Sequence, residues 1–287
     1  MYAVAGVSGQ TGAAVARALL DAGRKVRVIV RRAEAGAEWK AQGAEVAVAD
    51  LTDPAALTAA LRGTKGAYLL NPPSYRDSDP VARAASAGKA FAIAIDASGI
   101  ERAVVLSAVS AHLPAGHGII ATNRAVEQAL VNVRVPTASI RAQYFFENWA
   151  HVLQPVRQDG VLPSFLGPAD KRYPMVTVAD IAAEVVALLL GAPWKGGRVV
   201  ELSSFDASPA EVAQALSAQV GKPVTPIIVP RGQWPEILAG NGFSPATVSA
   251  FVEMYDGINS DIVAAEAGRE AVRGNSSLAL AARGLLH

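Results

Sequence analysis

The chain has 287 residues and 51% of them are hydrophobic, so it can form one large α/β domain or a domain with an added lobe. A formal net charge of +1, without a basic or acidic tail, gives no electrostatic reason to expect binding to nucleic acid or to a membrane surface. The absence of cysteine excludes disulfides, thiol catalysis and cysteine-ligated metal. No apolar run is long enough to cross a bilayer, and a strand expected from Tyr2 leaves no room for a signal peptide, so we expect a cytoplasmic protein.

The first twelve residues contain the motif on which the interpretation depends. A buried strand is expected at residues 2–6, and a helix rich in alanine and leucine at 13–22. Gly6, Gly9 and Gly12 lie between them at G-x-x-G-x-x-G spacing. Glycines in a strand-to-helix turn let a pyrophosphate approach the helix N-terminus, where free N–H groups and the helix dipole favour an anion. The glycines could also form an ordinary turn, but the strand and helix around them favour dinucleotide binding.

The second expected strand, residues 25–30, ends in two arginines. Arg31 follows Gly12 by about twenty positions, where an NAD-binding unit carries a carboxylate for the ribose hydroxyl and an NADP-binding unit carries an arginine. Glu34 is the nearest carboxylate to this strand end. A guanidinium binds phosphate with two hydrogen bonds. We therefore expect Arg31 to contact the 2′-phosphate of NADP(H), and Arg32 to stack on adenine or share the charge, although a solvated basic loop would look the same.

Strands and helices alternate through the rest of the first half, as in a parallel, doubly wound sheet. Further strands are expected at residues 45–49, 66–70, 103–106 and 137–140, and helices at 34–42, 53–61, 79–98 and 122–131. In such sheets ligands bind at the carboxyl ends of the strands. One crevice should therefore be lined by the loops at 6–12, Arg31, Asp50, 71–74, Ser107 and 141–145.

The second half changes character, because prolines divide it into short pieces. Thr177 and Ser208 each have capping-box spacing before a helix, and further strands are expected at 199–202 and 224–229. Aromatic residues gather in the last quarter of the chain. We therefore expect an NADP-binding Rossmann domain at 1–150 and a smaller α/β substrate lobe at 151–287, some of whose segments return to extend the main sheet.

Several stretches together resemble one family. They are residues 4–12, 30–32, 48–51, 106–107, 127–130, 140–148 and 176–182. With these the chain resembles the NmrA-like family of atypical short-chain dehydrogenases/reductases, and within it is most similar to bacterial NADPH:quinone oxidoreductases of NmrA type. The resemblance implies NADP(H), a Rossmann domain and a small substrate lobe. The family also contains members that bind NADP as a redox signal, with little or no catalysis.

Motif and resemblance together give a set of expected site residues. The resemblance implies that Asp50 accepts a hydrogen bond from the adenine amine, although it could instead begin a helix. The residues expected to bind the cofactor are Gly6, Ser8, Gly9, Gln10, Thr11, Gly12, Arg31, Arg32, Asp50, Leu51, Asn71, Pro72, Pro73, Ser107, Asn123, Ala142, Gln143, Tyr144 and Phe145. The catalytic candidates are Ser107, Asn123 and Tyr144.

One departure from the wider family bears on the reaction. Typical short-chain enzymes carry Tyr-x-x-x-Lys at the positions that match Ile119 and Asn123. Reduction of a ketone creates a strongly basic alkoxide and benefits from a general acid, whereas a quinone gives a stabilised phenolate that water can protonate. We therefore expect NADPH-dependent hydride transfer to a small, planar, apolar, electron-poor acceptor such as a quinone. The alternative is an NADP(H)-binding redox sensor.

Each of the remaining candidate site residues could have either a functional or a purely structural role. His112, His117 and His151 could donate a proton, but each is more simply a loop histidine, and the histidines are too scattered for a metal site. Asn123 could bind the nicotinamide ribose or cap its helix. Aromatic residues could line the acceptor site or pack in the core; they are Tyr144, Phe145, Trp149, Phe165, Trp234 and Phe251. The sequence is compatible with a monomer or a homodimer.

Overall fold

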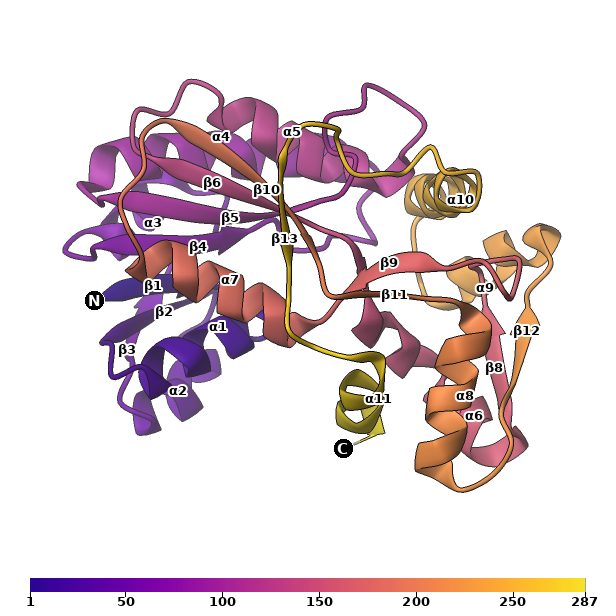
Figure 1. Cartoon of the computed structure of the whole chain (residues 1–287). Coiled ribbons are helices and arrows are strands. Elements are labelled where there is room, and N and C mark those ends of the chain that lie inside the picture. The colour runs from indigo at the N-terminus through magenta and orange to yellow at the C-terminus, as the bar shows by residue number, and fades with distance from the viewer. Residues whose placement is uncertain (287) are drawn as a thin grey trace.

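Eight parallel strands form one large sheet in the structure, a computed structural model that describes residues 1–286 (Figure 1). Their spatial order is β13-β10-β6-β5-β4-β1-β2-β3. The core order 3-2-1-4-5-6 is that of a Rossmann fold, which confirms the predicted doubly wound sheet. The strands are β1 (Tyr2–Ala5), β2 (Val26–Val30), β3 (Glu45–Val48), β4 (Gly66–Leu70), β5 (Arg102–Ala108), β6 (Thr137–Ala142), β10 (Gly197–Ser203) and β13 (Glu270–Arg273).

Helices cover both faces of this sheet, so its central strands are buried on both sides and read as apolar runs. One face is covered by α1 (Gln10–Asp21), α2 (Ala37–Ala41) and α7 (Val178–Leu190), the other by α3 (Pro54–Leu61), α4 (Pro80–Ser98) and α5 (Ala121–Leu130). Short 3₁₀ turns precede α2 and α5, namely η1 (Ala33–Gly36) and η2 (Gly118–Ile120). No helix within residues 1–286 is long and apolar enough to cross a membrane.

The remaining elements form a lobe beside the carboxyl ends of the strands (Figure 1). It contains two small sheets, one of β7 (Tyr144–Phe145), β9 (Tyr173–Val176) and β11 (Phe205–Ala207), the other of β8 (Val161–Ser164) and β12 (Thr225–Ile228). Its helical segments are η3 (Phe146–Val152), α6 (Leu153–Asp159), α8 (Pro209–Val220), η4 (Arg231–Gln233), α9 (Trp234–Gly240), α10 (Pro245–Asn259) and α11 (Leu278–Leu286).

Chain beyond residue 150 also extends the large sheet. The strand expected at 199–202 is β10, which pairs in parallel with β6, and β13 pairs with β10 at the sheet edge. Helix α7 packs against α1 in the first core. The strand expected at 224–229 is β12, which pairs with β8 in the lobe instead. Helix α1 begins at Gln10 rather than at residue 13, because Gly9 is its N-cap.

Asp180 joins the returning segments to the lobe. Its carboxylate accepts hydrogen bonds from the Ser204 hydroxyl and from the main-chain N–H groups of Asn275 and Ser276. Burial alone would raise the pKa of Asp180, but the hydrogen bonds from Ser204 and Ser276 outweigh it, so the pKa lies below its ordinary value. This side chain thereby ties the start of α7 to the segments that follow β10 and β13.

Replacing Asp180 by alanine should destabilise the fold by about 3 kcal/mol, because it leaves several buried donors without an acceptor. Urea unfolding measures the loss of folding free energy. The control variant Asp53→Ala, which removes the exposed cap of α3, should lose only ~1 kcal/mol. Since the pKa of Asp180 is lowered, its contribution is complete above the ordinary aspartate pKa of ~3.9 and is lost as the pH falls below it. Equal stability of the two variants would contradict this role.

Candidate functional site

The predicted phosphate turn links the end of β1 to the start of α1. Gly6 has a φ of +71°, and a Cβ there would lie 2.5 Å from the Leu70 side chain. Gly12 packs against β1, where a Cβ would lie 2.4 Å from the Ala5 carbonyl oxygen. Both positions therefore need glycine, one for a left-handed turn and one for close packing of helix on strand.

Gly9 differs from the other two glycines, because the space beside it is open. The nearest atom to an added Cβ is the Gly6 carbonyl oxygen at 3.5 Å, an ordinary contact. Gly9 is the N-cap of α1 and offers no side-chain capping bond, so the first N–H groups of the helix lack acceptors. Ser8, Gly9 and Gln10 are exposed. The turn thus presents free donors and the positive end of a helix dipole to an anion.

Arg31 and Arg32 directly follow the end of β2, and Asp50 lies two residues after the end of β3. Arg31 and Arg32 are exposed, as an arginine that meets a phosphate must be. Asp50 accepts from the Thr52 N–H at 2.8 Å and from its hydroxyl at 2.7 Å; these bonds, with the nearby charge of Arg31, lower the Asp50 pKa. The N-cap of α3 is Asp53, so the alternative in which Asp50 begins a helix is wrong. Asp50 therefore stays ionised beside the predicted adenine site.

The loop at 71–79 after β4 reaches across to the lobe. The Tyr75 ring lies 4.8 Å from the Phe243 ring and 5.4 Å from the Phe251 ring, measured between centroids. The Ser244 N–H donates to the Tyr75 carbonyl oxygen at 2.8 Å. Within this loop Asn71 and Pro72 are half-buried and Pro73 is exposed. The loop therefore connects the carboxyl edge of the sheet to the segment that contains the end of α9 and the start of α10.

Ser107 belongs to a row of polar side chains on adjacent strands. The sheet register places Ser107 beside Arg141 and Arg141 beside Glu201. Ser107 Oγ donates to Glu127 Oε1 at 2.5 Å, and Arg141 holds the same carboxylate through two bonds of 3.0 and 2.7 Å. Arg141 Nη1 also donates to Glu266 Oε2 at 2.5 Å and lies 3.4 Å from Glu201 Oε1. We call these five side chains the Arg141 cluster.

The centre of the Arg141 cluster is buried, and burial and neighbouring charges together shift the pKa values of its members. The Arg141 and Glu201 side chains are 4% and 3% exposed. Burial alone would lower the pKa of Arg141, but its bonds to Glu127 and Glu266 raise it above the ordinary value. Burial raises the pKa of Glu201, whereas Arg269 and Arg141 lower that of Glu266 to about 2. Because the Ser107 hydroxyl donates its proton to the Glu127 carboxylate in a hydrogen bond, it is not a free proton donor.

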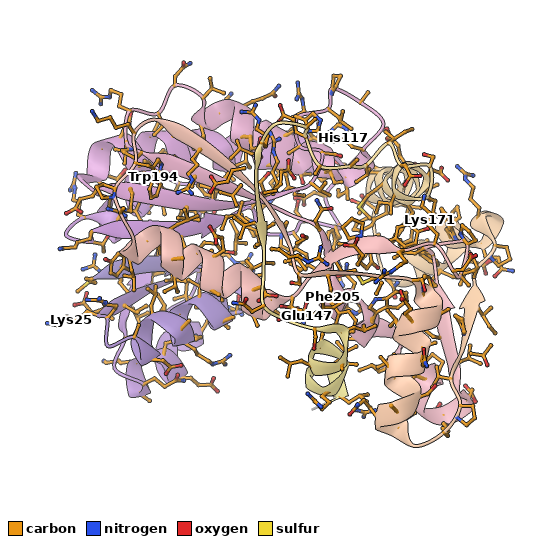
Figure 2. All side chains as sticks on the ribbon, viewed as in Figure 1. Lys25, His117, Glu147, Lys171, Trp194 and Phe205 are labelled. Atoms are coloured by element: carbon orange, nitrogen blue, oxygen red, sulfur yellow. The ribbon has the colours of Figure 1, made fainter. Side chains whose placement is uncertain are left out.

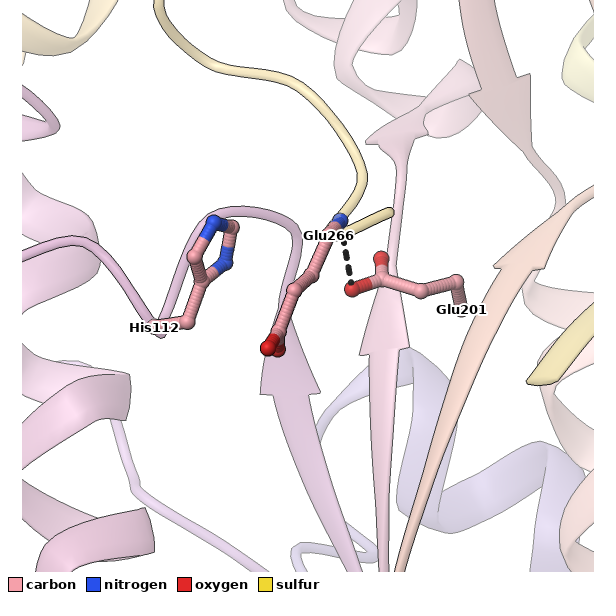
Figure 3. Close-up of side chains that lie close together, drawn as sticks. All are labelled: His112, Glu201 and Glu266. Carbon is pink, nitrogen blue, oxygen red and sulfur yellow. Dashed lines mark hydrogen bonds between the residues drawn. The ribbon is translucent and has the colours of Figure 1, made fainter. Parts of the chain in front are cut away.

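His112 lies beside two carboxylates of the Arg141 cluster, those of Glu201 and Glu266 (Figure 3). Potential ligand atoms of His112, Glu201 and Glu266 lie within 4.8 Å of one another, and the Glu266 N–H donates to Glu201 at 3.2 Å. Arg141 already supplies a positive charge to both carboxylates. This geometry is that of an ion cluster built around a guanidinium.

The catalytic candidates other than Ser107 come from α5 and from the segment after β6. The N-cap of helix α5 is Ile120, which makes no side-chain capping bond. The prediction that Asn123 could cap this helix is therefore wrong. Ile119 lies in η2, with no tyrosine in its place. Tyr144 follows the carboxyl end of β6 by two residues and is half-buried. Ala142 is buried, and Gln143 and Phe145 are half-buried beside it.

The expected aromatic wall is smaller than predicted. The Phe165 ring stacks on Trp234 at 5.3 Å and meets Tyr255 edge-on at 5.1 Å. Trp234 is 4% exposed and its indole N–H donates to the Val229 carbonyl oxygen, so it packs behind Phe165. Trp149 is 3% exposed and is likewise part of the lobe core. Phe165 and Phe251 are half-buried and can contact a ligand.

The other two candidate histidines, His117 and His151, differ in their burial. His117 is 2% exposed, lies close to α10 (Figure 2), and within residues 1–286 neither ring nitrogen has a side-chain hydrogen bond. Burial lowers the pKa of His117, so the ring stays neutral. His151 is exposed in η3.

The sequence interpretation missed Arg141, Glu201 and Glu266 as a group. A signal was present, because Arg141 follows the buried Ile140 and Glu201 lies between Val200 and Leu202. A charge inside an apolar strand requires a partner. The partners could not be identified from the chain alone, since they lie 60 and 125 residues from Arg141.

Residues 2–264 match the model of the NmrA-like family. The chain is 33% identical over 227 residues to (4-alkanoyl-5-oxo-2,5-dihydrofuran-3-yl)methyl phosphate reductase of Streptomyces griseus, covering 78% of this chain and 75% of that protein. It is 28% identical to quinone oxidoreductase 2 of Escherichia coli, covering 78% and 76%. The crystal structure of an NADPH-dependent quinone oxidoreductase from Escherichia coli, in complex with NADPH, superposes with a TM-score of 0.78 at 22% identity over all of both chains.

The open space beside Gly9 gives a direct test of the phosphate turn. Gly9→Val should abolish cofactor binding while the protein stays folded, because the added branches occupy the space that a pyrophosphate needs. Gly12→Val should instead unfold or strongly destabilise it, since no space exists there. Fluorescence titration with NADPH, beside circular dichroism, separates the two effects. A folded Gly9→Val variant that binds NADPH normally would refute this site.

Proposed function

The chain belongs to the NmrA-like family, and from that premise we propose that it is an NADPH-dependent reductase that transfers hydride to an electron-poor acceptor such as a quinone. The observation that carries the proposal is the turn from Gly6 to Gly12, which offers unpaired helix N–H groups beside an open Gly9. The two curated relatives described above are named as a reductase and as a quinone oxidoreductase, which agrees with this assignment.

The choice of NADPH over NADH rests on the residues after β2. Arg31 and Arg32 are exposed there, while the nearest carboxylate, Glu34, lies in η1. A 2′-phosphate would meet a guanidinium that binds it with two hydrogen bonds. The turn at Gly9 and the arginine at Arg31 end adjacent strands of the sheet, so one extended dinucleotide can reach both.

The acceptor class follows from the proton donors that the site lacks. Ile119 and Asn123 replace the tyrosine and lysine of typical short-chain enzymes, and Ser107 is committed to Glu127. A ketone would leave an alkoxide without an acid, whereas a quinone leaves a phenolate that water can protonate. The half-buried rings of Phe165 and Phe251 offer apolar contacts to a flat acceptor.

The same absence of an acid favours a second candidate. A protein that binds NADPH without turnover could report the redox state of the cell to a partner. This redox-sensor alternative predicts tight cofactor binding, no activity with any acceptor, and a partner protein whose affinity depends on the cofactor. It ranks second because the relatives at 33% and 28% identity are named as enzymes, a reductase and a quinone oxidoreductase.

Cofactor preference tests the role of Arg31. Arg31→Ala should weaken NADPH binding by ~1.5–3 kcal/mol, because a charge-assisted contact is lost, and should leave NADH binding nearly unchanged. Isothermal titration measures both affinities. Arg24→Ala, an exposed arginine before the amino end of β2, is the matched control and should change neither. Equal affinity of the unaltered protein for NADPH and NADH would contradict the proposal.

Acceptor preference tests the reaction itself. NADPH oxidation should be observed with benzoquinones and naphthoquinones and not with simple ketones, because only the former tolerate the missing acid. Ser107→Ala should slow quinone reduction only about tenfold, roughly 1.4 kcal/mol. Vigorous ketone reduction would show that an acid has been overlooked. Silence with every acceptor would favour the redox sensor.

A further inference from the structure

The loop between β4 and α4 is fastened to the lobe at its tip. A turn forms this tip, since the Asp77 N–H donates to the Ser74 carbonyl oxygen at 3.0 Å. Ser244, the N-cap of α10, donates from its N–H to the Tyr75 carbonyl oxygen at 2.8 Å and from its hydroxyl to the Asp77 carbonyl oxygen at 2.6 Å. We call residues 71–79 the strap, because they join the sheet to the lobe.

Aromatic rings add a second contact between the strap and the lobe. The Tyr75 ring packs against the rings of Phe243 and Phe251, which lie 5.2 Å from each other. Phe243 directly precedes the N-cap of α10, and Phe251 lies within that helix. Tyr75 is 38% exposed, so this contact lies at the surface of the molecule.

The other end of the strap begins beside the proposed phosphate turn. Leu70 is the last residue of β4, and its side chain occupies the space next to Gly6, where a Cβ would lie 2.5 Å from it. Strand β4 also pairs with β1, the strand that ends in the turn. The strap therefore runs from the neighbourhood of the phosphate turn to the start of α10.

The order of the strands decides what the strap crosses. Strands β2, β1, β4, β5 and β6 are neighbours in that order. The proposed cofactor site extends from Arg31 after β2, past the glycine turn after β1, to Ser107 on β5. A dinucleotide bound along this edge must pass the carboxyl end of β4, where the strap leaves the sheet for the lobe. The strap and the dinucleotide therefore cross.

The contacts that fasten the strap are of a kind that opens readily. Pro73, Tyr75 and Arg76 are exposed. Asp77 also forms an ion pair of 3.3 Å with Arg83 of α4, but both side chains are exposed, and such pairs contribute little to stability. Local opening requires the least free energy where buried contacts are few and the backbone is exposed to solvent. Loops with these properties act as lids in many enzymes.

We propose that the strap is a gate for the dinucleotide, which releases Ser244 and the two phenylalanine rings when NADPH enters and closes again over the bound cofactor. This inference rests on the proposed cofactor site and adds the control of exchange to it. A gate has a kinetic signature: fastening it slows binding and release alike, whereas loosening it speeds both. A strap that only held the lobe in place would leave both rates unchanged.

The absence of cysteine allows one disulfide to lock the strap. The double variant Tyr75→Cys/Ser244→Cys places two thiols where a main-chain hydrogen bond already brings the residues together, as a disulfide requires. Stopped-flow fluorescence should show NADPH uptake about 100-fold slower in the oxidised than in the reduced form, because binding then waits for a change that the lock prevents. NADPH bound before oxidation should remain through gel filtration, and reduction should release it.

A loosened strap gives the opposite test without a disulfide. Tyr75→Ala removes the ring from the aromatic contact, and Tyr75→Phe is its matched control because it keeps the ring. Release of NADPH, measured by displacement with excess NADP⁺, should be about tenfold faster in Tyr75→Ala and unchanged in Tyr75→Phe. The bonds from Ser244 reach main-chain oxygens of the strap, so both variants should stay folded by circular dichroism.

The contrary results separate the gate from the proposed function. Equal uptake by the oxidised and reduced forms, with a thiol assay showing a complete disulfide, would overturn the gate and leave the cofactor site standing. Where the disulfide does not form, equal release from Tyr75→Ala and Tyr75→Phe overturns the gate. An unaltered protein that binds no NADPH would refute the proposed cofactor site, and the gate with it.

Discussion

The ion pairs of the buried Arg141 guanidinium are the interactions on which the carboxyl edge of the sheet depends. Arg141 lies near the carboxyl end of β6 and pairs with carboxylates from α5, from β10 and from the segment before β13. Each of these charges would be costly to bury alone, and removal of one partner from such a group typically costs about 3–5 kcal/mol. The cluster therefore holds together elements that are distant in sequence, and it fixes Ser107 at the same time.

Parallel strands determine where the chemistry can occur. Because all eight strands of the large sheet run in the same direction, the glycine turn, Arg31 and the loop after β6 come to one edge. The lobe packs beside this edge, and both Tyr144 from β7 and Tyr255 from α10 pack against its core. The proposed cofactor and acceptor sites thus draw on different parts of the chain, the first on local turns and the second on contacts between the sheet and the lobe.

The local features could be predicted from the sequence, because each depends on neighbouring residues. The strand-to-helix turn at Gly6 to Gly12, the strands through β6 and the caps at Thr177 and Ser208 all follow from short patterns. The sequence predicted that some segments after residue 150 return to the large sheet, but it did not identify β10 as one of them. Strand β13 contains the charged residues Glu270 and Arg273, and its apolar and polar residues do not alternate, so the sequence does not predict a strand there.

The features that depend on tertiary contacts could not be predicted. Trp234 looked like a ligand wall in the sequence, but its indole N–H finds a carbonyl inside the lobe, which turns the ring inward. Asn123 looked like a cap, but the preceding 3₁₀ turn η2 moves the start of α5 to Ala121.

A crystal structure of the protein with NADPH would test the central claim, that one crevice at the carboxyl edge of the sheet binds the dinucleotide and presents it to the acceptor. The account predicts the pyrophosphate at the N–H groups of Gln10 and Thr11, the 2′-phosphate on Arg31, and the nicotinamide beside Tyr144. A dinucleotide bound at another edge of the sheet, or one whose nicotinamide points away from the lobe, would contradict it.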